Sequence, residues 1–279
     1  MILMRFPNGL AKALTFSYDD CVEQDMELVR IFNQYGMKAT FNLNTAQYAP
    51  EGRKWREGQF FRKMSRSQTI DLFKDGPHEV AVHCANHQLL TNAPTAMIVA
   101  EVMEDRKSLE HDFGGIVRSM AYPYGPVCQT AVDALQSCGI LFARTIEASH
   151  RFDIPADWLR LPPTCHHADP RLMELADSFL QKQEPAIYGC QLFYVWGHSF
   201  EFETNRNWHV IHDFCEKMTG KDDIWYATNG EIFEYVEAWQ KLICSADGKT
   251  LFNPTARTLW LRNNRNILSI GPGETAVIE

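Results

Sequence analysis

The stretch Thr15-Phe16-Ser17-Tyr18-Asp19-Asp20-Cys21 decides how the rest of the chain is interpreted. It ends an apolar, strand-like run that starts at Ala11, and a segment with helical spacing follows it. Two adjacent carboxylates repel each other, and folded proteins keep such a pair where a metal ion or a basic group lies close by. We therefore expect Asp19 and Asp20 to belong to a functional site at the end of this strand.

Outward from this stretch, strand-like and helix-like segments alternate about seven times up to residue 242. Such alternation is typical of parallel strands joined by helical crossovers, and a barrel is its natural closure. We predict an α/β fold, a (β/α) barrel of about seven strands. The predicted strands are 11–18, 37–43, 79–82, 116–121, 140–144, 191–196 and 223–227.

The last part of the chain has a different pattern. Short strand-like segments alternate there with turn residues such as Asn263-Asn264 and Gly271-Pro272-Gly273. We predict a barrel over residues 1–243 and a small β-strand extension over residues 244–279 that packs on it. An interface role for this extension stays open.

Composition limits the classes of function. The chain has 279 residues and a net charge of −8 without a basic cluster, which argues against a nucleic-acid partner or an anionic membrane partner. No stretch reaches the roughly 18 apolar residues of a membrane span. Residues 1–9 do not resemble a signal peptide, and the eight cysteines form no C-x-x-C pair. We expect a cytoplasmic protein with reduced thiols and leave homo-oligomerisation open.

Polar residues that could bind a metal or take part in catalysis follow several predicted strands. Because the carboxyl ends of barrel strands meet on one face, these residues should converge there. They are Asp19-Asp20, His83 and His87, Tyr122-Pro123-Tyr124, and His198.

The spacing of His83 and His87 suits a metal. On one turn of helix, residues four apart share a face, so both imidazoles could bind one ion. A carboxylate from Asp19-Asp20 would complete a set of two histidines and one carboxylate with open positions. Cys84 would point away from that face, so we leave it out.

Four segments come in the order and strand context of the polysaccharide deacetylase family, carbohydrate esterase family four, which the chain resembles over roughly residues 10–240. The segments are Thr15-Phe16-Ser17-Tyr18-Asp19-Asp20, His83-Cys84-Ala85-Asn86-His87, Met120-Ala121-Tyr122-Pro123-Tyr124-Gly125 and Val195-Trp196-Gly197-His198. The resemblance implies a distorted (β/α) barrel and a role in carbohydrate metabolism. It also implies removal of N-acetyl groups from an amino sugar or oligosaccharide.

The resemblance further implies a role for each site residue. Asp19 would be the general base and His198 the general acid. The main-chain N–H of Tyr124 would help to hold the oxyanion. The ligands of one divalent metal would be Asp20, His83 and His87. Zinc is the first choice, with cobalt, manganese or nickel as alternatives.

The chain also departs from the family pattern. Ala121 stands where the family usually has an arginine that pairs with the base, and Arg118 is a candidate replacement only if its strand turns it inward. Cys21 stands where glycine is common. Asp157-Trp158 is a candidate for the remaining motif, although it lies in a proline-rich loop.

Two other functions stay open at this point. One is hydrolysis of another non-peptide C–N bond, such as that of a cyclic amide, for which the missing arginine leaves room. The other is a catalytically inactive barrel that binds sugar. We interpret His166-His167 first as structural residues and second as part of a loop lining the substrate mouth. Glu201 and Glu203 we interpret as a solvated face.

Overall fold

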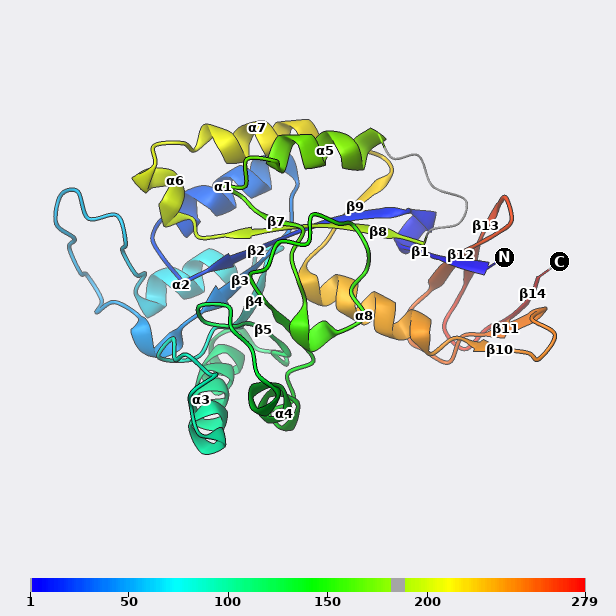
Figure 1. Cartoon of the computed structure of the whole chain (residues 1–279), viewed down its shortest axis with the longest axis horizontal. Helices are drawn as coiled ribbons and strands as arrows, with labels where there is room; N and C mark the ends of the chain where they lie inside the picture. The colour runs from blue at the N-terminus through cyan, green and yellow to red at the C-terminus, as the bar shows by residue number, and fades with distance from the viewer. Residues whose placement is uncertain (1, 182–188, 279) are drawn as a thin grey trace.

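The computed structural model describes residues 2–181 and 189–278. Its centre is a curled parallel sheet of eight strands (Figure 1). Seven strands follow the order β6-β5-β4-β3-β2-β8-β7, and β9 pairs with β2. The predicted α/β barrel is thus confirmed. The strands are β2 (Lys12–Asp19), β3 (Ala39–Leu43), β4 (Glu79–Val82), β5 (Ser119–Ala121), β6 (Phe142–Arg144), β7 (Cys165–His166), β8 (Gln191–Gly197) and β9 (Ile224–Tyr226).

Strand β2 is the central strand, and all of its residues are buried. Strand β8 pairs with it over Lys12–Tyr18 on one side. On the other side, β9 pairs with Lys12–Leu14 and β3 pairs with Phe16–Asp19. Its apolar residues, such as Leu14 and Phe16, pack in the core, while Ser17 and Asp19 are polar and buried near its carboxyl end. The strand therefore carries Asp19 to the carboxyl edge of the sheet.

A single residue joins the two edges of the sheet. Leu161 donates its N–H to the carbonyl of Ala143 at 3.0 Å and accepts the N–H of Thr145 at 3.0 Å. Four residues later the chain enters β7, which pairs with β8. The closure is thus a bridge and not a full strand, which is why the barrel is distorted.

Helices cover both sides of the sheet (Figure 1). Helices α1, α5 and α7 lie together on one side, while α3 and α4 lie on the other. Gly36 ends α1 at a φ of 68°, as its position after the helical pattern predicts. The helices are α1 (Asp25–Tyr35), α2 (Arg66–Phe73), α3 (Thr95–Phe113), α4 (Gln129–Ser137), α5 (Leu172–Gln181), α6 (Phe200–Thr204), α7 (His209–Met218) and α8 (Asn229–Gln240), with short 3-10 turns η1 (Pro7–Gly9), η2 (Thr45–Gln47) and η3 (Trp158–Arg160).

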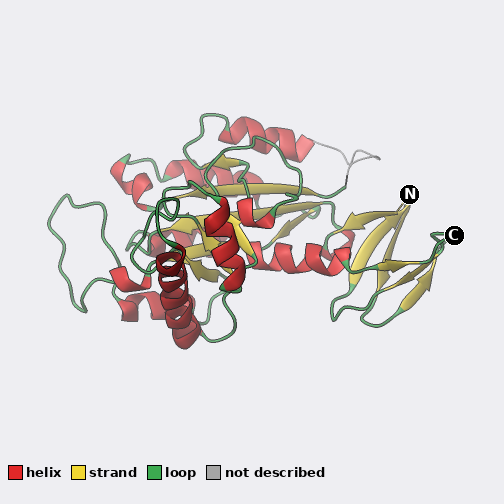
Figure 2. Cartoon of the chain, turned by 60° about the horizontal axis from the view of Figure 1, so that its bottom comes forward, coloured by secondary structure: helices red, strands yellow, loops and turns green. Residues whose placement is uncertain are grey.

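The final strands form two small antiparallel sheets at one end of the molecule (Figure 2). One has the order β10-β11-β14, and the other has the order β1-β12-β13. The first strand of the chain therefore pairs with a strand of the tail, and Ile2 lies opposite Asn263. The division at residues 243 and 244 stays a prediction. These strands are β1 (Ile2–Arg5), β10 (Ile243–Cys244), β11 (Thr250–Phe252), β12 (Leu259–Asn263), β13 (Asn266–Ile270) and β14 (Thr275–Val277).

Two further features bear on the expectations from composition. All eight cysteines are free thiols. Among the described residues, none of the helices combines the length and the apolarity needed to cross a bilayer.

Candidate active site

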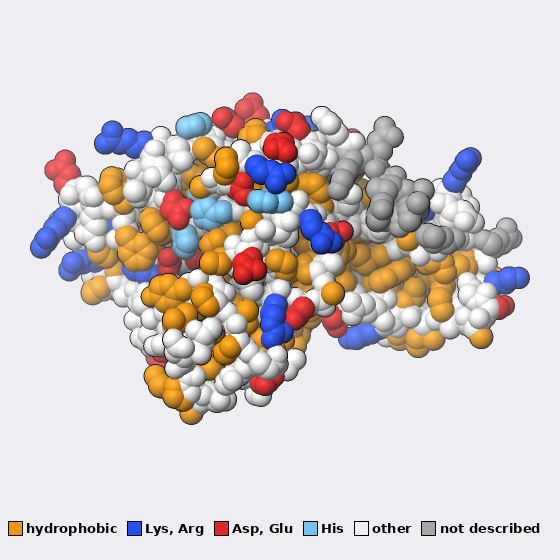
Figure 3. Space-filling model, viewed as in Figure 1, with side chains coloured by type: hydrophobic (Ala, Val, Ile, Leu, Met, Phe, Trp, Pro, Cys, Tyr) orange, Lys and Arg blue, Asp and Glu red, His pale blue; other side chains and the backbone are white. Residues whose placement is uncertain are grey.

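Histidine and acidic side chains gather on one face of the molecule (Figure 3), and the side chains expected at the strand ends meet in one cleft. Directly after β2, Asp20 and Cys21 have φ angles of 85° and 53°, which turn the chain sharply. Positive φ is uncommon for residues other than glycine and often marks functional sites. The turn gives the two neighbouring acids, Asp19 and Asp20, different partners.

Asp20, His83 and His87 come together, as the sequence predicts. Their ligand atoms all lie within 4.8 Å of one another. His83 Nδ1 lies 2.8 Å from the carbonyl oxygen of Ala121. Since a carbonyl only accepts, Nδ1 carries the proton and Nε2 keeps its lone pair for the cluster. Burial lowers the pKa of both histidines, that of His87 to about 4, so both are neutral, as metal ligation requires.

The expected helical turn at residues 83–87 is wrong. The segment is a tight turn, in which Cys84 and His87 have φ angles of 60° and 56°. The N–H of His87 binds the carbonyl of Cys84 at 3.1 Å, and the two imidazole centroids are 4.8 Å apart. A spacing of four brings two side chains together in such a turn as well as in a helix.

Lys63 supports Asp20, and sequence reasoning missed it. Its Nζ donates to the main-chain carbonyl of Asp20 and to Asn44 Oδ1, the latter at 2.9 Å, and lies 3.4 Å from Asp20 Oδ1. Lys63 comes from an irregular segment, so no local pattern points to this contact. It ties the strained turn after β2 to the segment before α2.

Asp19 lies beside the metal-ligand cluster, with Oδ2 3.8 Å from His83 Nε2, and a buried arginine binds its carboxylate. Arg144 donates to Asp19 Oδ2, and Asn42 Nδ2 donates to Asp19 Oδ1 at 2.8 Å. The Arg144 guanidinium also stacks over Trp196, 4.4 Å from the ring centroid. Burial opposes ionisation of Asp19, but the charge and the hydrogen bond of Arg144, together with the charge of His198, outweigh it and lower the pKa of the carboxyl to about 2.

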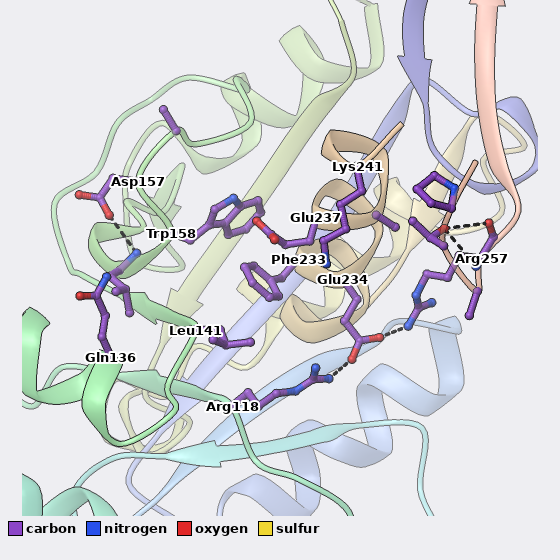
Figure 4. A pocket seen from close by; sticks show the side chains of 16 residues that line it. Arg118, Gln136, Leu141, Asp157, Trp158, Phe233, Glu234, Glu237, Lys241 and Arg257 are labelled. Atoms are coloured by element: carbon purple, nitrogen blue, oxygen red, sulfur yellow. Dashed lines mark hydrogen bonds and ion pairs between the residues drawn. The ribbon is translucent and has the colours of Figure 1, made fainter. Parts of the chain in front are cut away.

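Arg144 replaces the arginine that is absent at position 121. Ala121 on β5 lies directly opposite Arg144 on β6 in the sheet register. The guanidinium thus reaches Asp19 from the next strand. Arg118, the candidate from sequence, instead pairs with Glu234 in a pocket of about 850 Å³ (Figure 4). An arginine at the end of a predicted strand was the signal that could have identified this residue.

His198 faces both aspartates. Its Nε2 lies 3.9 Å from Asp19 Oδ2 and 3.9 Å from Asp20 Oδ2, while its Nδ1 lies 3.0 Å from Glu201 Oε1. Burial alone would lower the pKa of His198, but the hydrogen bond that its ring donates to Glu201 and the charges of the two aspartates raise it above its usual value. The interpretation of Glu201 as part of a solvated face is therefore wrong.

Glu201 also binds His166 and His167, the histidine pair that the sequence suggested to be structural or part of a loop at the mouth. Its Oε2 lies 3.3 Å from His166 Nε2 and 3.1 Å from His167 Nε2. The N–H of Ala168 donates to His166 Nδ1 at 3.1 Å, so His166 Nε2 carries the ring proton. Burial opposes ionisation of Glu201, but the hydrogen bonds from His167 and His198 keep the pKa of this carboxyl well below its usual value.

Tyr124 lies at the rim of the cleft, where the sequence places it. Its ring is 4.4 Å from the His87 ring, and the side chain is 63% exposed. Its φ of 63° reverses the chain after β5, and Gly125 follows with a φ of 94°. Within the described residues the main-chain N–H of Tyr124 has no acceptor, so it is free for a ligand in the cleft.

Asp157-Trp158 lies outside the cleft, so its assignment to the remaining motif is wrong. Asp157 accepts the N–H of Leu159 at 3.0 Å and pairs with Arg160 at 2.8 Å. Trp158 packs against Phe233 in the pocket of Figure 4, with the ring centroids 5.2 Å apart. Both residues serve the structure of this loop.

Comparison with known proteins agrees with the geometry. Residues 7–143 match the family model for polysaccharide deacetylase. No curated protein sequence matches the chain. Solved structures do match, at low identity, and they support the fold.

A structure of a putative polysaccharide deacetylase from Mycobacterium smegmatis is 16% identical, with 85% of this chain and 94% of that chain covered and a TM-score of 0.59. The Xyl-CE4 domain of a multidomain xylanase, from the hindgut metagenome of Trinervitermes trinervoides, is 15% identical, with 81% and 92% covered and a TM-score of 0.51. The Streptococcus pyogenes deacetylase PplD in complex with acetate is 18% identical, with 47% of this chain and 55% of that chain covered and a TM-score of 0.42. The first half of the chain, residues 7–143, thus matches the polysaccharide deacetylase family, whose members are hydrolases, and the solved structures agree with its fold.

Proposed function

We propose that the protein is a metal-dependent hydrolase that removes N-acetyl groups from an amino sugar or oligosaccharide, giving acetate and a free amine. One observation carries the proposal. A cluster of Asp20, His83 and His87 lies in the same cleft as a separate carboxylate, Asp19, and a separate imidazole, His198. This arrangement supports the assignment of metal binding, proton acceptance and proton donation to different side chains of one site.

The ligand cluster fits a divalent metal. The hydrogen bond from His83 Nδ1 to a carbonyl leaves Nε2 unprotonated, which is the usual support of a metal-binding histidine. Two imidazoles and one carboxylate suit zinc, with cobalt, manganese or nickel as alternatives. A metal bound there would polarise the acetamide carbonyl and increase the acidity of water.

Asp19 would act as the general base. Arg144 and Asn42 hold its carboxylate in place, and its low pKa keeps it ionised over the whole physiological range. It would accept the proton of the water whose oxygen attacks the acetamide carbon. The free N–H of Tyr124 would stabilise the negative charge that develops on the carbonyl oxygen.

His198 would act as the general acid. Its raised pKa favours the protonated ring, and Glu201 fixes the ring from the side opposite the aspartates. It would donate its proton to the sugar nitrogen as the C–N bond breaks, because an unprotonated amine leaves poorly. The products are acetate and the amine.

Metal removal and return test this function. Purified protein is treated with a chelator, and acetate release from chitooligosaccharides is measured before and after addition of zinc, cobalt, manganese or nickel. We expect loss and recovery of activity with about one metal per chain. Activity that persists in the metal-free protein would contradict the metal dependence.

The presence of Arg144 bears on the alternative of a cyclic-amide hydrolase. That alternative depended on the absence of an arginine partner for Asp19, and Arg144 supplies one. An inactive sugar-binding barrel would bind the oligosaccharides and release no acetate in any metal. The same assay therefore separates it from the proposed enzyme.

A further inference from the structure

An arm of residues 50–62 extends beside the cleft. It follows β3 and η2 and returns to α2, so it leaves the carboxyl edge of the sheet, where Asp19 and Asp20 lie. Figure 1 shows it as the pale blue loop that stands out from the barrel. Nothing in the proposed chemistry uses this arm.

The stem of the arm is tied down by two glutamates. Arg62 binds Glu23 Oε2 through Nε at 2.8 Å and Glu203 Oε2 through Nη2 at 2.9 Å. Trp55 Nε1 donates to Glu23 Oε1 at 3.0 Å. The carboxylates at the stem are therefore already engaged by Arg62 and Trp55.

The rest of the arm presents cations without partners. Arg53, Lys54 and Arg56 are exposed, and within the described part of the chain none of their side chains forms an ion pair. They line a hollow of about 590 Å³ together with Trp55, Glu57 and the stem residues Arg62, Glu23 and Glu203. The Arg53 guanidinium lies 5.2 Å from the Trp55 ring. In a chain with a net charge of −8, this is a local excess of positive charge.

Aromatic rings connect the arm with the cleft. The Phe61 ring lies 5.1 Å from Phe200, whose ring lies 5.4 Å from His198. Phe61 is 43% exposed, and Tyr124 is an exposed ring at the rim formed by His87. Exposed rings offer apolar faces on which sugar rings can pack. An extended oligosaccharide in the cleft would thus lead toward the cations of the arm.

We propose that the arm is a subsite for an anionic group of the substrate, so that the preferred substrate is an N-acetylated oligosaccharide that carries carboxylates or phosphates. The inference rests on the proposed deacetylase function. Guanidinium groups bind carboxylate and phosphate oxygens through paired hydrogen bonds, and unpaired cations beside a site attract anions before contact. Arg53, Lys54 and Arg56 provide both properties.

The test compares charge removal at the arm with charge removal elsewhere. The arm variant is Arg53→Gln/Lys54→Gln/Arg56→Gln. Its matched control is Lys74→Gln/Lys107→Gln/Lys249→Gln, which removes three exposed cations that also lack ion pairs in the described structure. The anionic probes are a hexasaccharide of alternating N-acetylglucosamine and glucuronate, and chitohexaose that carries 6-phosphates. Neutral chitohexaose is the reference probe.

Binding is measured by calorimetry on the metal-free protein, and kcat/KM is measured on the metal-loaded protein. In the wild type, we expect a higher affinity and a higher kcat/KM for the anionic probes than for the neutral one. In the arm variant this preference should fall by at least about tenfold, mainly because Kd and KM for the anionic probe rise. Added salt should reduce the wild-type preference in the same direction. The probe with the larger loss identifies the anion as carboxylate or phosphate.

Failure of this inference is distinct from failure of the proposed function. The anionic subsite would be overturned if the arm variant lost affinity equally for anionic and neutral probes, or if the control variant lost as much affinity for the anionic probe as the arm variant does. Either result would count even if deacetylation occurs. Arm-dependent binding of an anionic probe without acetate release would support the subsite and contradict the enzyme function.

Discussion

Two clusters of two histidines and one carboxylate lie in this cleft, and one imidazole in each, His83 and His166, faces its carboxylate with the opposite protonation of Nε2. In the first cluster, His83 Nδ1 donates to the carbonyl of Ala121, so Nε2 presents a lone pair beside Asp20. In the second, His166 Nδ1 accepts the N–H of Ala168, so Nε2 presents a proton to Glu201. The main-chain partners of His83 and His166 thus determine whether Nε2 offers a lone pair or a proton to the carboxylate.

The comparison shows that composition alone does not define a metal site. Both clusters have ligand atoms within 4.8 Å of one another. The second cluster is a set of hydrogen-bond donors that keeps Glu201 ionised and directed at His198. We therefore expect the first cluster to bind the metal and the second to orient the acid.

The largest expected effect separates the two clusters directly. His87→Ala should abolish stoichiometric zinc binding and lower kcat/KM by on the order of a thousandfold, because several kcal/mol of transition-state stabilisation depend on the ion. His166→Ala, at a ring of similar exposure, should retain about one zinc per chain. Metal content after dialysis and acetate release measure both. Zinc loss in His166→Ala with retention in His87→Ala would reverse the assignment.

Asp19 lies between the clusters, and its arginine provides the next test. Arg144→Ala should lower kcat on the order of a hundredfold and the free energy of unfolding by about 3 kcal/mol, because a buried carboxylate loses its partner. Acetate release and urea unfolding measure these changes. The control is Arg118→Ala, the alternative suggested by sequence, whose ion pair lies in the separate pocket. Equal losses of activity in both variants would contradict the role of Arg144.

Removal of charge from the second cluster should have a smaller effect. Glu201→Gln should lower kcat by about 10- to 100-fold, because His198 loses its orienting partner. Glu201 helps to raise the pKa of His198, and the acid acts only while protonated. The alkaline limb of the pH–kcat profile should therefore move to lower pH in this variant. Glu216→Gln on α7, an exposed glutamate, should leave that limb in place.

The smallest expected effect concerns the packing behind the second cluster. A Cβ at Gly197 would lie 2.0 Å from Nδ1 of the buried His167, so the ring would have to move. Gly197→Ala should lower the free energy of unfolding by about 1–3 kcal/mol and reduce kcat a few-fold through Glu201. Gly76→Ala, where the nearest atom is 3.7 Å away, is the control. Thermal unfolding of both variants would show whether the loss is confined to position 197.

The barrel and the residues of the first cluster could be predicted because both depend on patterns within short segments of the sequence. Alternating periodicities indicate strands and helices, and the strand ends carry Asp20, His83 and His87 to one edge. The helical turn was wrong because a tight turn with positive φ at Cys84 produces the same spacing. The roles of Asp20, His83 and His87 in catalysis stay predictions, which the variants above test.

The supporting residues could not be identified in the same way, because their roles depend on contacts between distant segments. Arg144 acts across a strand register, and Lys63 reaches Asp20 from an irregular loop. Glu201 follows His198 by three residues, and its position alone does not distinguish it from a solvated glutamate. In each case the role depends on a contact in three dimensions, and the periodicity of the sequence does not reveal such contacts.

The pairing of β1 with β12 has a consequence for the order of assembly. Ile2 lies opposite Asn263, and Arg5 lies opposite Trp260. During synthesis, residues 2–5 leave the ribosome well before residues 259–263, so they have no sheet to join until that later segment has followed. The barrel strands can pair earlier, so the small sheet that joins residues 2–5 to residues 259–263 should form after the barrel. Cotranslational folding should therefore proceed from the middle outward.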